Sequence, residues 1–592
     1  MSQKEFLYAA STGDAEGIRR LAADRGLDPT CKVSSGHGGI HWAAQSGRPD
    51  IVSLLITEFC VSPASVADNG DLPVHSACRA GCNSTLELLV NQHGANANAK
   101  NTLNGASALH LSAQEGHAST AKLLVRNFNA NLHAKTTDGL CPLHSAAQNG
   151  RDEMIRLLYD LGANLHATTN IGSTALHLAS DWGHNSTIRL LIEMGLNSNC
   201  SDAENWRPLH YASRDGHDAA VRLLVQLNAN PNAVNNNGFS PIHLAAREGQ
   251  TSTVKLLSEL GSKLNSVAVT SGDTPLHCAA RGGHANCARL LVELGADLCA
   301  VNVLNGATSV HLAAQEGHEN VVRCLLALGA DPNPISFLGT RPLHLAALNG
   351  HDDTIRLLVS EFGVDPNCPS GEDDSSALHL ASLRGNMSTV RTLVSLGAEP
   401  NICSRDNSTP LHYSCQEGHL SVSNLLVELG CDISKKTLSS RTAANVALIF
   451  GHTAVYSRLE LVGFLKARAQ QGEWQQLKSA IEEAQFSVPP VQWVPLMPLQ
   501  ARTQLSAWVQ SSIIDSRACY CALYRPLMAS GSLTPDIRLK VAHDGLKHIV
   551  RLITSYLVFS QPATRRFFRE ADEILMEAPS ASEGSHIHCR LQ

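Results

Sequence analysis

Most of the chain consists of blocks in which two apolar stretches alternate with short polar segments. The first stretch contains a pair of small residues, as in Ala279-Ala280, and ends at a glycine. The second contains adjacent leucines, as in Leu290-Leu291, and is followed by a turn sequence such as Gly295-Ala296. A small pair lets a neighbouring element approach closely, and glycine is a common helix terminator. Each block therefore predicts two short helices followed by a loop.

A histidine marks the start of almost every block. It follows a small residue or proline and then an apolar residue, and it recurs after 33 to 35 residues. Its positions are His41, His75, His110, His144, His177, His210, His243, His277, His311, His344, His379 and His412. Ahead of one of them, Thr274-Pro275 suits a helix start, because threonine caps a helix and proline fits the first helical position. A fixed period of this length predicts stacked repeats.

The segment from Thr274 to Ala280 reads Thr-Pro-Leu-His-Cys-Ala-Ala. It resembles the ankyrin repeat, which has a period of 33 residues and the signature T-P-L-H-x-A. One block cannot bury its own apolar faces, so blocks stack into a continuous one-dimensional core. The expected fold class is an all-α-dominated solenoid: an ankyrin-repeat stack of helix pairs plus β-hairpin loops, with a small helical C-terminal domain.

The block pattern divides the chain into three parts. Residues 2–462 are expected to form the solenoid, with about fourteen units including a degenerate cap at each end. Residues 463–577 are expected to form a helical domain, in which the stretch 499–528 carries apolar residues on one side: Leu505, Trp508, Val509, Ile513 and Ile514. Residues 578–592 are polar and predict a flexible tail.

Composition excludes several classes of protein. The chain has 46 Lys and Arg residues against 53 Asp and Glu residues, a formal net charge of -7, which disfavours nucleic acid as a partner. Aromatic residues are only 4% of the total, so the core must be built from thin layers of Leu, Ala and Val. The 17 cysteines lack the paired spacing of a disulfide scaffold, and no run of 18 apolar residues occurs. We expect a monomeric cytoplasmic protein, with the nucleus as the alternative.

The chemistry of the sequence favours no catalytic or metal site. Phosphate-binding, serine-hydrolase, zinc-protease and kinase motifs are missing. The recurrent histidines lie on different layers, and the ankyrin resemblance implies that they tie adjacent hairpins together. A zinc site would need Cys519 and Cys521 with ligands from His586, His588 and Cys589 in the flexible tail, which is unfavourable. We expect no enzyme activity, no cofactor and no metal.

The ankyrin resemblance leaves two kinds of position free for function: the hairpin tips, and the two residues before the glycine that closes the first helix. Aromatic and arginine residues occupy these positions in successive blocks and form what we call the aromatic–arginine patch: Trp182, Trp206, Phe239, Arg214, Arg247 and Arg281. Such residues dominate protein interfaces, which predicts a partner-binding surface. Because Asp215 and Glu248 follow two of the arginines, local pairing and packing remain the alternative.

A second set of apolar residues occupies the same kinds of position. Phe337 and Leu338 fall at a hairpin tip, and Leu348 and Leu383 fall on the face where other blocks have Gln or Arg. They predict an apolar groove for a peptide or helix. The alternative is that the C-terminal domain folds back onto this surface.

The last four residues, Cys589-Arg590-Leu591-Gln592, match the C-a-a-X pattern and resemble a farnesylation signal at Cys589. The polar lead-in favours the match, whereas Arg590 is not aliphatic, and a chance match is the alternative. A single lipid without a polybasic segment would give only weak, reversible membrane association.

Together these patterns predict a non-enzymatic scaffold or adaptor that binds one or more proteins or peptides on the concave face of an ankyrin-repeat array. One alternative is a substrate-recognition adaptor whose C-terminal domain recruits an enzyme such as a ubiquitin ligase. A third is that the helices of 499–577 form a cryptic catalytic domain.

Overall fold

The structure is a computed structural model that describes residues 2–25, 28–32, 36–371 and 373–471. The chain falls into two compact units, Met1–Ala346 and Ala347–Gln592, here called the first and second units. The described residues form helices joined by loops. They contain isolated β-bridges at the bases of loops and no named strand. The predicted helix pairs are thus present, and five of the hairpin loops are each closed by a single β-bridge.

Each repeat consists of a first and a second helix. The N-terminal pair is α1 (Ser2–Thr12) and α2 (Ala15–Arg25). The first helices that follow are α3 (Gly39–Gln45), α5 (Pro73–Arg79), α7 (Ala108–Glu115), α9 (Pro142–Gln148), α11 (Ala175–Asp181), α13 (Pro208–Arg214), α15 (Pro241–Arg247), α17 (Pro275–Gly282), α19 (Ser309–Gln315), α21 (Pro342–Asn349), α23 (Ala377–Arg384), α25 (Pro410–Gln416) and α27 (Ala443–Ile449). The second helices are α4 (Pro49–Thr57), α6 (Asn83–Glu87), α8 (Ala118–Phe128), α10 (Asp152–Asp160), α12 (Asn185–Glu193), α14 (Asp218–Gln226), α16 (Thr251–Glu259), α18 (Ala285–Glu293), α20 (Glu319–Ala327), α22 (Asp352–Arg356), α24 (Met387–Ser395), α26 (Leu420–Glu428) and α28 (Thr453–Gln471).

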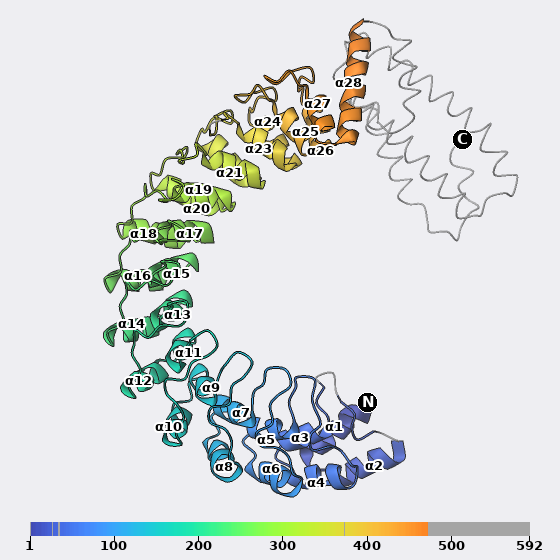
Figure 1. Cartoon of the computed structure of the whole chain (residues 1–592), viewed down its shortest axis with the longest axis vertical. Coiled ribbons are helices and arrows are strands. Elements are labelled where there is room, and N and C mark those ends of the chain that lie inside the picture. The colour runs from blue at the N-terminus through green and yellow to red at the C-terminus, as the bar shows by residue number, and fades with distance from the viewer. Residues whose placement is uncertain (1, 26–27, 33–35, 372, 472–592) are drawn as a thin grey trace, which may run out of the picture. The chain divides into compact units, whose positions relative to one another are not determined.

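Helices of the same kind pack side by side. In the first unit, each first helix from α1 to α19 contacts the next first helix, and the second helices form a parallel row. Figure 1 shows the first helices from α3 to α17 on the inner side of a curved stack and the second helices from α4 to α18 on the outer side. In the second unit, α23, α25 and α27 form one row, and α22, α24, α26 and α28 form the other.

The helix boundaries follow from local sequence. In α17, Thr274 at the N-cap has an extended backbone, Pro275 is the first helical residue, and Gly283 ends the helix in the left-handed conformation with φ +82°. Behind the histidine, Ala279 and Ala280 are fully buried, as are Cys287 and Leu291 of α18. The core therefore consists of thin layers of small and aliphatic residues between helix rows, as composition predicted.

Two second helices contain an extra residue relative to their neighbours. In both cases the extra residue lies in a π-helical turn that continues the α-helix. These turns are η1 (Leu88–Gln92) after α6 and η2 (Leu357–Glu361) after α22. A π turn holds one more residue without moving the flanking helix faces. This explains how repeats of unequal length keep their apolar residues in register.

The recurrent histidines link each repeat to the next hairpin. In α13, Nδ1 of His210 accepts a hydrogen bond from the backbone N–H of Arg207 at 3.0 Å. Its Nε2 donates to the carbonyl oxygens of Ala233 and Phe239 in the following hairpin, at 3.1 and 3.2 Å. Burial lowers the pKa of His210 to about 4 and keeps the ring neutral. The structural role implied by the ankyrin resemblance is thus confirmed for this histidine.

A second histidine, which the sequence analysis did not single out, links each repeat to the preceding one. It directly follows the closing glycine in several blocks. Nε2 of His184 bonds the carbonyl oxygen of Gln148 at 2.9 Å, and Nε2 of His217 bonds that of Asp181 at 2.9 Å. These carbonyls lie at the ends of first helices, where they lack helical partners. The recurring Gly-His dipeptide was the signal that could have revealed this bond.

The last described helix crosses the predicted boundary at residue 462. Helix α28 runs from Thr453 to Gln471, and Val455, Leu459 and Val462 are buried along it. The remainder of the predicted helical domain of 463–577 and the tail of 578–592 lie outside the described residues, so both stay predictions.

Candidate protein-binding surface

The arginines of the aromatic–arginine patch share one structural position. Each lies four residues after a repeat histidine and is held by the residue four positions before that histidine. The guanidinium of Arg214 lies 5.8 Å from the centroid of the Trp206 ring, and that of Arg247 lies 5.9 Å from the Phe239 ring. Arg281 forms an ion pair with Asp273 at 3.1 Å. An aromatic or anionic residue in the hairpin thus fixes the arginine of its own repeat.

Arg214 is the most strongly held of the three. One Nη2 atom lies 2.6 Å from Oδ1 of Asp181 in α11 and 2.9 Å from Oδ2 of Asp215, so the guanidinium joins two repeats. It also lies 5.4 Å from the centroid of the Tyr211 ring. The hydroxyl of Tyr211 donates to Oδ2 of Asp202 at 2.7 Å. The cluster is therefore a partly buried network, and Arg214 has little freedom to reach a partner.

The two carboxyl groups that contact Arg214 have pKa values shifted in opposite directions. Burial raises the pKa of Asp181 to about 6, although the Arg214 charge opposes the shift. Burial acts to raise the pKa of the neighbouring Asp215 as well, but the hydrogen bonds and the charge of Arg214, together with a hydrogen bond from Asp181, lower it on balance. The guanidinium of Arg214 thus stabilises the charged form of Asp215 more than that of Asp181.

The pairing that sequence analysis left open is present for both arginines with adjacent acids. Nε of Arg214 donates to Asp215 at 3.0 Å, and Nε of Arg247 donates to Glu248 at 3.1 Å. Trp206 and Phe239 are half-buried, and their rings pack edge-on or tilted against His210 and His243. Most of the predicted patch is therefore engaged inside the solenoid.

Trp182 differs from the other members of the patch. It is the C-cap residue of α11, its side chain is 56% exposed, and no ring contact involves it within the described part of the chain. A large exposed indole is the kind of side chain that anchors protein interfaces. Trp182 is thus the member most available for binding.

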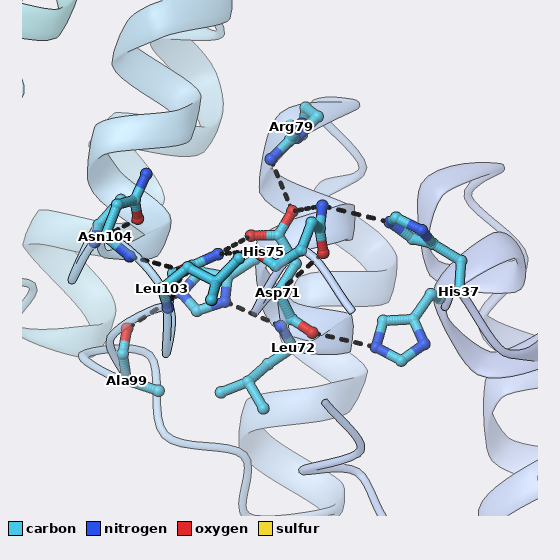
Figure 2. A network of polar contacts seen from close by, with 12 residues as sticks. His37, Asp71, Leu72, His75, Arg79, Ala99, Leu103 and Asn104 are labelled. Carbon is cyan, nitrogen blue, oxygen red and sulfur yellow. Dashed lines mark hydrogen bonds and ion pairs between the residues drawn. The ribbon is translucent and has the colours of Figure 1, made fainter. Parts of the chain in front are cut away.

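The structure also shows a polar network that the sequence did not reveal, built twice in the first unit. Figure 2 shows the first copy: buried Asp71 accepts hydrogen bonds from Arg79 at 2.6 Å and from the amide of Asn101 at 2.6 Å. In the second copy Asp273 accepts from Arg281 and from Asn302, the latter at 2.6 Å. Both copies hold a hairpin against the preceding one.

In each copy the asparagine also shapes its own hairpin tip. Oδ1 of Asn101 accepts from the N–H of Leu103 at 2.7 Å, and Oδ1 of Asn302 accepts from that of Leu304 at 2.9 Å. Leu103 and Leu304 are exposed beside this support. Arg281 of the aromatic–arginine patch thus has a structural role in this network.

The hairpin tips carry a row of exposed apolar residues. Each tip follows a backbone bond that closes the hairpin, such as the bond from Ser336 N–H to Thr340 O at 2.9 Å. In three successive hairpins of the first unit the tips contain apolar side chains that are 56 to 78% exposed: Val269, Val303, Leu304, Phe337 and Leu338. We call these five residues the apolar tip row.

Adjacent tips support one another through glycine. A Cβ atom built on Gly306 would lie 2.4 Å from Cδ1 of Phe337, so the phenyl ring packs directly on this glycine. The backbone N–H of Phe337 donates to Asn305 O at 2.9 Å. Likewise, a Cβ on Gly272 would lie 3.1 Å from Cγ of Leu304. The apolar tip row is therefore continuous and rigidly held.

Only part of this row is predictable from a single block of sequence. Phe337 and Leu338 were predicted as exposed apolar residues, whereas Val269, Val303 and Leu304 were not, because valines near a turn look like ordinary loop residues in one block. Aligning the tips of all blocks would have shown them, since the preceding tips hold Asp138, Glu204 and the pair Asn236-Asn237. Leu103 and Ile171 are separate exposed residues on other tips.

The two leucines of the predicted groove lie elsewhere. Leu348 and Leu383 are half-buried residues of the second unit, near the ends of α21 and α23. The carbonyl of Leu348 accepts from Asn386 at 3.1 Å, and that of Leu383 accepts from His419 at 2.9 Å. Phe337 and Leu338 belong to the first unit. A single groove formed by all four stays a prediction.

The sequence profile of ankyrin repeats matches nearly all of the described chain. Overlapping matches cover residues 6–101, 83–169, 161–235, 227–302, 298–370, 343–437 and 378–465. The chain belongs to the ankyrin-repeat family. Among solved structures it is similar to the human ASB11 ankyrin repeat domain, with 27% sequence identity over 38% of this chain and 100% of that one, at a TM-score of 0.35. No curated protein matches the sequence.

The described part of this ankyrin-repeat protein also sets limits on other kinds of site. Within it, no group of three or more His, Cys, Asp or Glu side chains converges to hold a metal ion. Across the same residues, no helix has the length and apolar character needed to cross a membrane. Cys589, the candidate farnesylation site, and the candidate zinc ligands from Cys519 onward lie outside the described residues.

Proposed function

We propose that this ankyrin-repeat protein is a protein-binding scaffold and that the apolar tip row is its main contact surface. One observation carries the proposal: three successive hairpin tips expose large apolar side chains where preceding tips of the same unit are mostly polar. Exposed apolar residues that adjoin one another mark interaction sites, whereas single ones need no explanation. The ankyrin fold in general mediates protein interactions and is typically non-enzymatic.

The geometry of the row defines the partner it fits. Each hairpin contributes two extended segments, and neighbouring segments in such arrangements lie about 4.8 Å apart, so successive tips are about 10 Å apart. A peptide in the polyproline II conformation has this spacing, because it rises about 3.1 Å per residue and every third side chain lies on the same face. A helix with apolar side chains about seven residues apart also has it. The proposed partner therefore presents a regular apolar stripe.

Trp182 is proposed as a second contact. Its exposed indole is the free part of the aromatic–arginine patch, whereas Trp206 and the arginines are held internally. For this reason Trp182→Ala is expected to weaken partner binding with little effect on folding. Trp206→Ala should mainly destabilise the repeat, because the Trp206 ring packs against Tyr211 and Arg214.

The test compares exposed apolar tips with polar ones. The double variant Leu304→Ser with Leu338→Ser is expected to reduce partner recovery about tenfold or more in a proximity-labelling pull-down from cells, since central apolar anchors dominate binding. The matched control, Asp138→Ser with Asn237→Ser, changes the corresponding tip positions of other hairpins. Thermal unfolding checks that both variants fold. Equal recovery of partners by the two folded variants would contradict the proposal.

A finer role for the C-terminal part stays a prediction. If residues 463–592 recruit an enzyme such as a ubiquitin ligase, labelling with the full chain should recover that enzyme and labelling with residues 1–462 should not. Purified full-length protein tested for turnover addresses the alternative of a cryptic catalytic domain. The Cys589→Ser variant tests farnesylation, since intact mass detects the lipid directly.

A further inference from the structure

One position in the first helix is strictly small until the last repeat. The third residue after the repeat histidine has an exposed fraction of 0% in twelve repeats. These residues are Ala44, Cys78, Ala113, Ala147, Ser180, Ser213, Ala246, Ala280, Ala314, Ala347, Ser382 and Cys415. In the last repeat Asn445 replaces the histidine, and the corresponding residue is Leu448, which is 49% exposed.

The small residue is explained by close helix packing. First helices lie in direct contact, as α13 does with α15 and α25 with α27, and a side chain larger than Ser, Ala or Cys at this position would push the next first helix away. Leucine at residue 448 is therefore incompatible with another ankyrin layer in the same register. Whatever covers α27 must have a different shape.

The residues that follow Leu448 reinforce this conclusion. Ile449 and Phe450 are 55% and 54% exposed, so three consecutive large apolar side chains lie at the end of α27. In the preceding repeat the two corresponding positions are Gln416 and Glu417, which suit water. We call Leu448, Ile449 and Phe450 the terminal apolar face. Solenoid ends that face water are polar, so this end is built to be covered.

Helix α28 does not complete the cover. It packs on α27 and α26 through buried residues such as Val455 and Leu459, which continue the row of second helices. Within the described residues the first-helix row ends at α27, and the terminal apolar face is exposed there. The missing element is thus a neighbour for α27 alone.

We propose that residues 499–528 of this same chain pack on the terminal apolar face and cap the solenoid. The chain leaves α28 at Gln471, in the same repeat as the face, and 121 residues follow in the sequence. A flexible linker with the 27-residue length of 472–498 has a root-mean-square reach of about 30 Å. A tethered segment of this kind has an effective concentration in the millimolar range, which favours it over a free protein of similar affinity.

The sequence of 499–528 suits this position. Leu505, Trp508, Val509 and Ile513 are spaced by three and four residues, so a helix in this stretch has one apolar face. Such a helix can pack its large apolar side chains against the large side chains of the terminal apolar face on α27. An ankyrin first helix instead relies on small residues for its contact. The larger interhelical distance explains why Leu448 replaces Ala or Ser.

The first experiment places a photo-crosslinking phenylalanine analogue at Phe450 in the full-length chain. We expect crosslinked peptides from 499–528 of the same molecule. The control carries the analogue at Glu417, the corresponding position one repeat earlier, and should give at least about tenfold fewer such products, because that position faces water. Mixing heavy-isotope and normal chains distinguishes links within one molecule from links between two. Links between molecules, links to other segments, or no difference from the control would overturn the proposal.

The second experiment changes the proposed occupant. The full-length double variant Leu505→Ser with Ile513→Ser should accelerate amide hydrogen exchange in residues 443–450 by about tenfold or more, because the cover is lost. Its control, Gln504→Ser with Gln510→Ser, changes polar residues of the same stretch and should leave the exchange unchanged. Unchanged exchange in the apolar variant would reject residues 499–528 as the cap.

Discussion

At the scale of single residues, the repeat histidine is the main polar link between layers. Its role depends on a neutral ring with one nitrogen that accepts and one that donates. His144 shows the pattern: Nδ1 accepts from the N–H of Cys141, and Nε2 donates to Ala167 O, both at 3.0 Å. Protonation would put a donor on Nδ1 against the N–H and charge a buried ring. The fold therefore requires these histidines to remain uncharged.

This requirement makes stability depend on pH. Burial lowers the pKa to about 4 for seven of these histidines: His41, His110, His144, His210, His243, His311 and His379. In the unfolded chain their pKa is about 6.5, so between pH 6.5 and 4 the unfolded state binds more protons. As the pH decreases through this window, the free energy of unfolding should decrease by about 1.4 kcal/mol per pH unit for each histidine in the segment that unfolds. Above about pH 7 the histidines contribute no further change.

The measurement is urea unfolding followed by circular dichroism at pH 7.0 and pH 5.5, at constant ionic strength. We expect a lower midpoint at pH 5.5. Asp181 acts in the opposite direction, because its pKa is raised to about 6 and its protonated form is favoured in the folded state. One carboxyl cannot offset several histidines. A midpoint that is equal or higher at pH 5.5 would contradict the assignment of neutral histidines.

At the scale of elements, each hairpin rests on the one before it through a glycine. Gly306 has φ +72°, and the Phe337 ring and backbone lie where its Cβ would be. The recurring glycine was visible in the sequence. Its contact with the next hairpin was not, because that contact joins residues about 30 positions apart whose distance depends on how the layers stack.

Gly306→Ala should therefore destabilise the protein for two reasons. An alanine in the left-handed conformation lowers the free energy of unfolding by about 1 kcal/mol relative to glycine, and the clash of its Cβ with Phe337 lowers it by about as much again or more. Gly295→Ala is the matched control, since Gly295 has φ +101° and nothing within 4 Å of its Cβ position. It should cost only about 1 kcal/mol in urea unfolding. Equal losses for the two variants would show that Phe337 does not pack on Gly306.

A double-mutant cycle isolates the ring. Combined with Phe337→Ala, the Gly306→Ala substitution should cost less than it does alone, because the phenyl ring no longer clashes. Part of the cost should remain, since the backbone nitrogen of Phe337 lies 2.7 Å from the same Cβ position.

At the scale of the whole molecule, a stack of layers is coupled mainly between nearest neighbours. Hydrogen bonds of the repeat histidine reach only the next hairpin, and those of the histidine after the closing glycine reach only the preceding helix. Stability in such a protein is approximately a sum of repeat and interface contributions. Damage to one layer should therefore stay local.

His144→Ala tests this property. It leaves the N–H of Cys141 and the carbonyl of Ala167 without their bonds, at a cost of about 1–3 kcal/mol. Amide exchange should accelerate in α9 and α10 and their neighbouring hairpins and should be unchanged in α25. His166→Ala, at an exposed loop position, is the control and should have no effect. Acceleration throughout the described chain would instead indicate one cooperative unit.

The sequence by itself determined the repeat period, the helix pairs and the resemblance to ankyrin repeats, because each depends on local signals repeated many times. That resemblance implied the structural role of the histidines. It also located exposed positions at the hairpin tips. Only the tertiary structure decided which of those side chains are free. Arg214 and Trp206 of one repeat hold each other while Trp182 stays exposed, and among the described residues no first helix follows α27 to cover Leu448. Such outcomes depend on distances between layers, which no single block encodes.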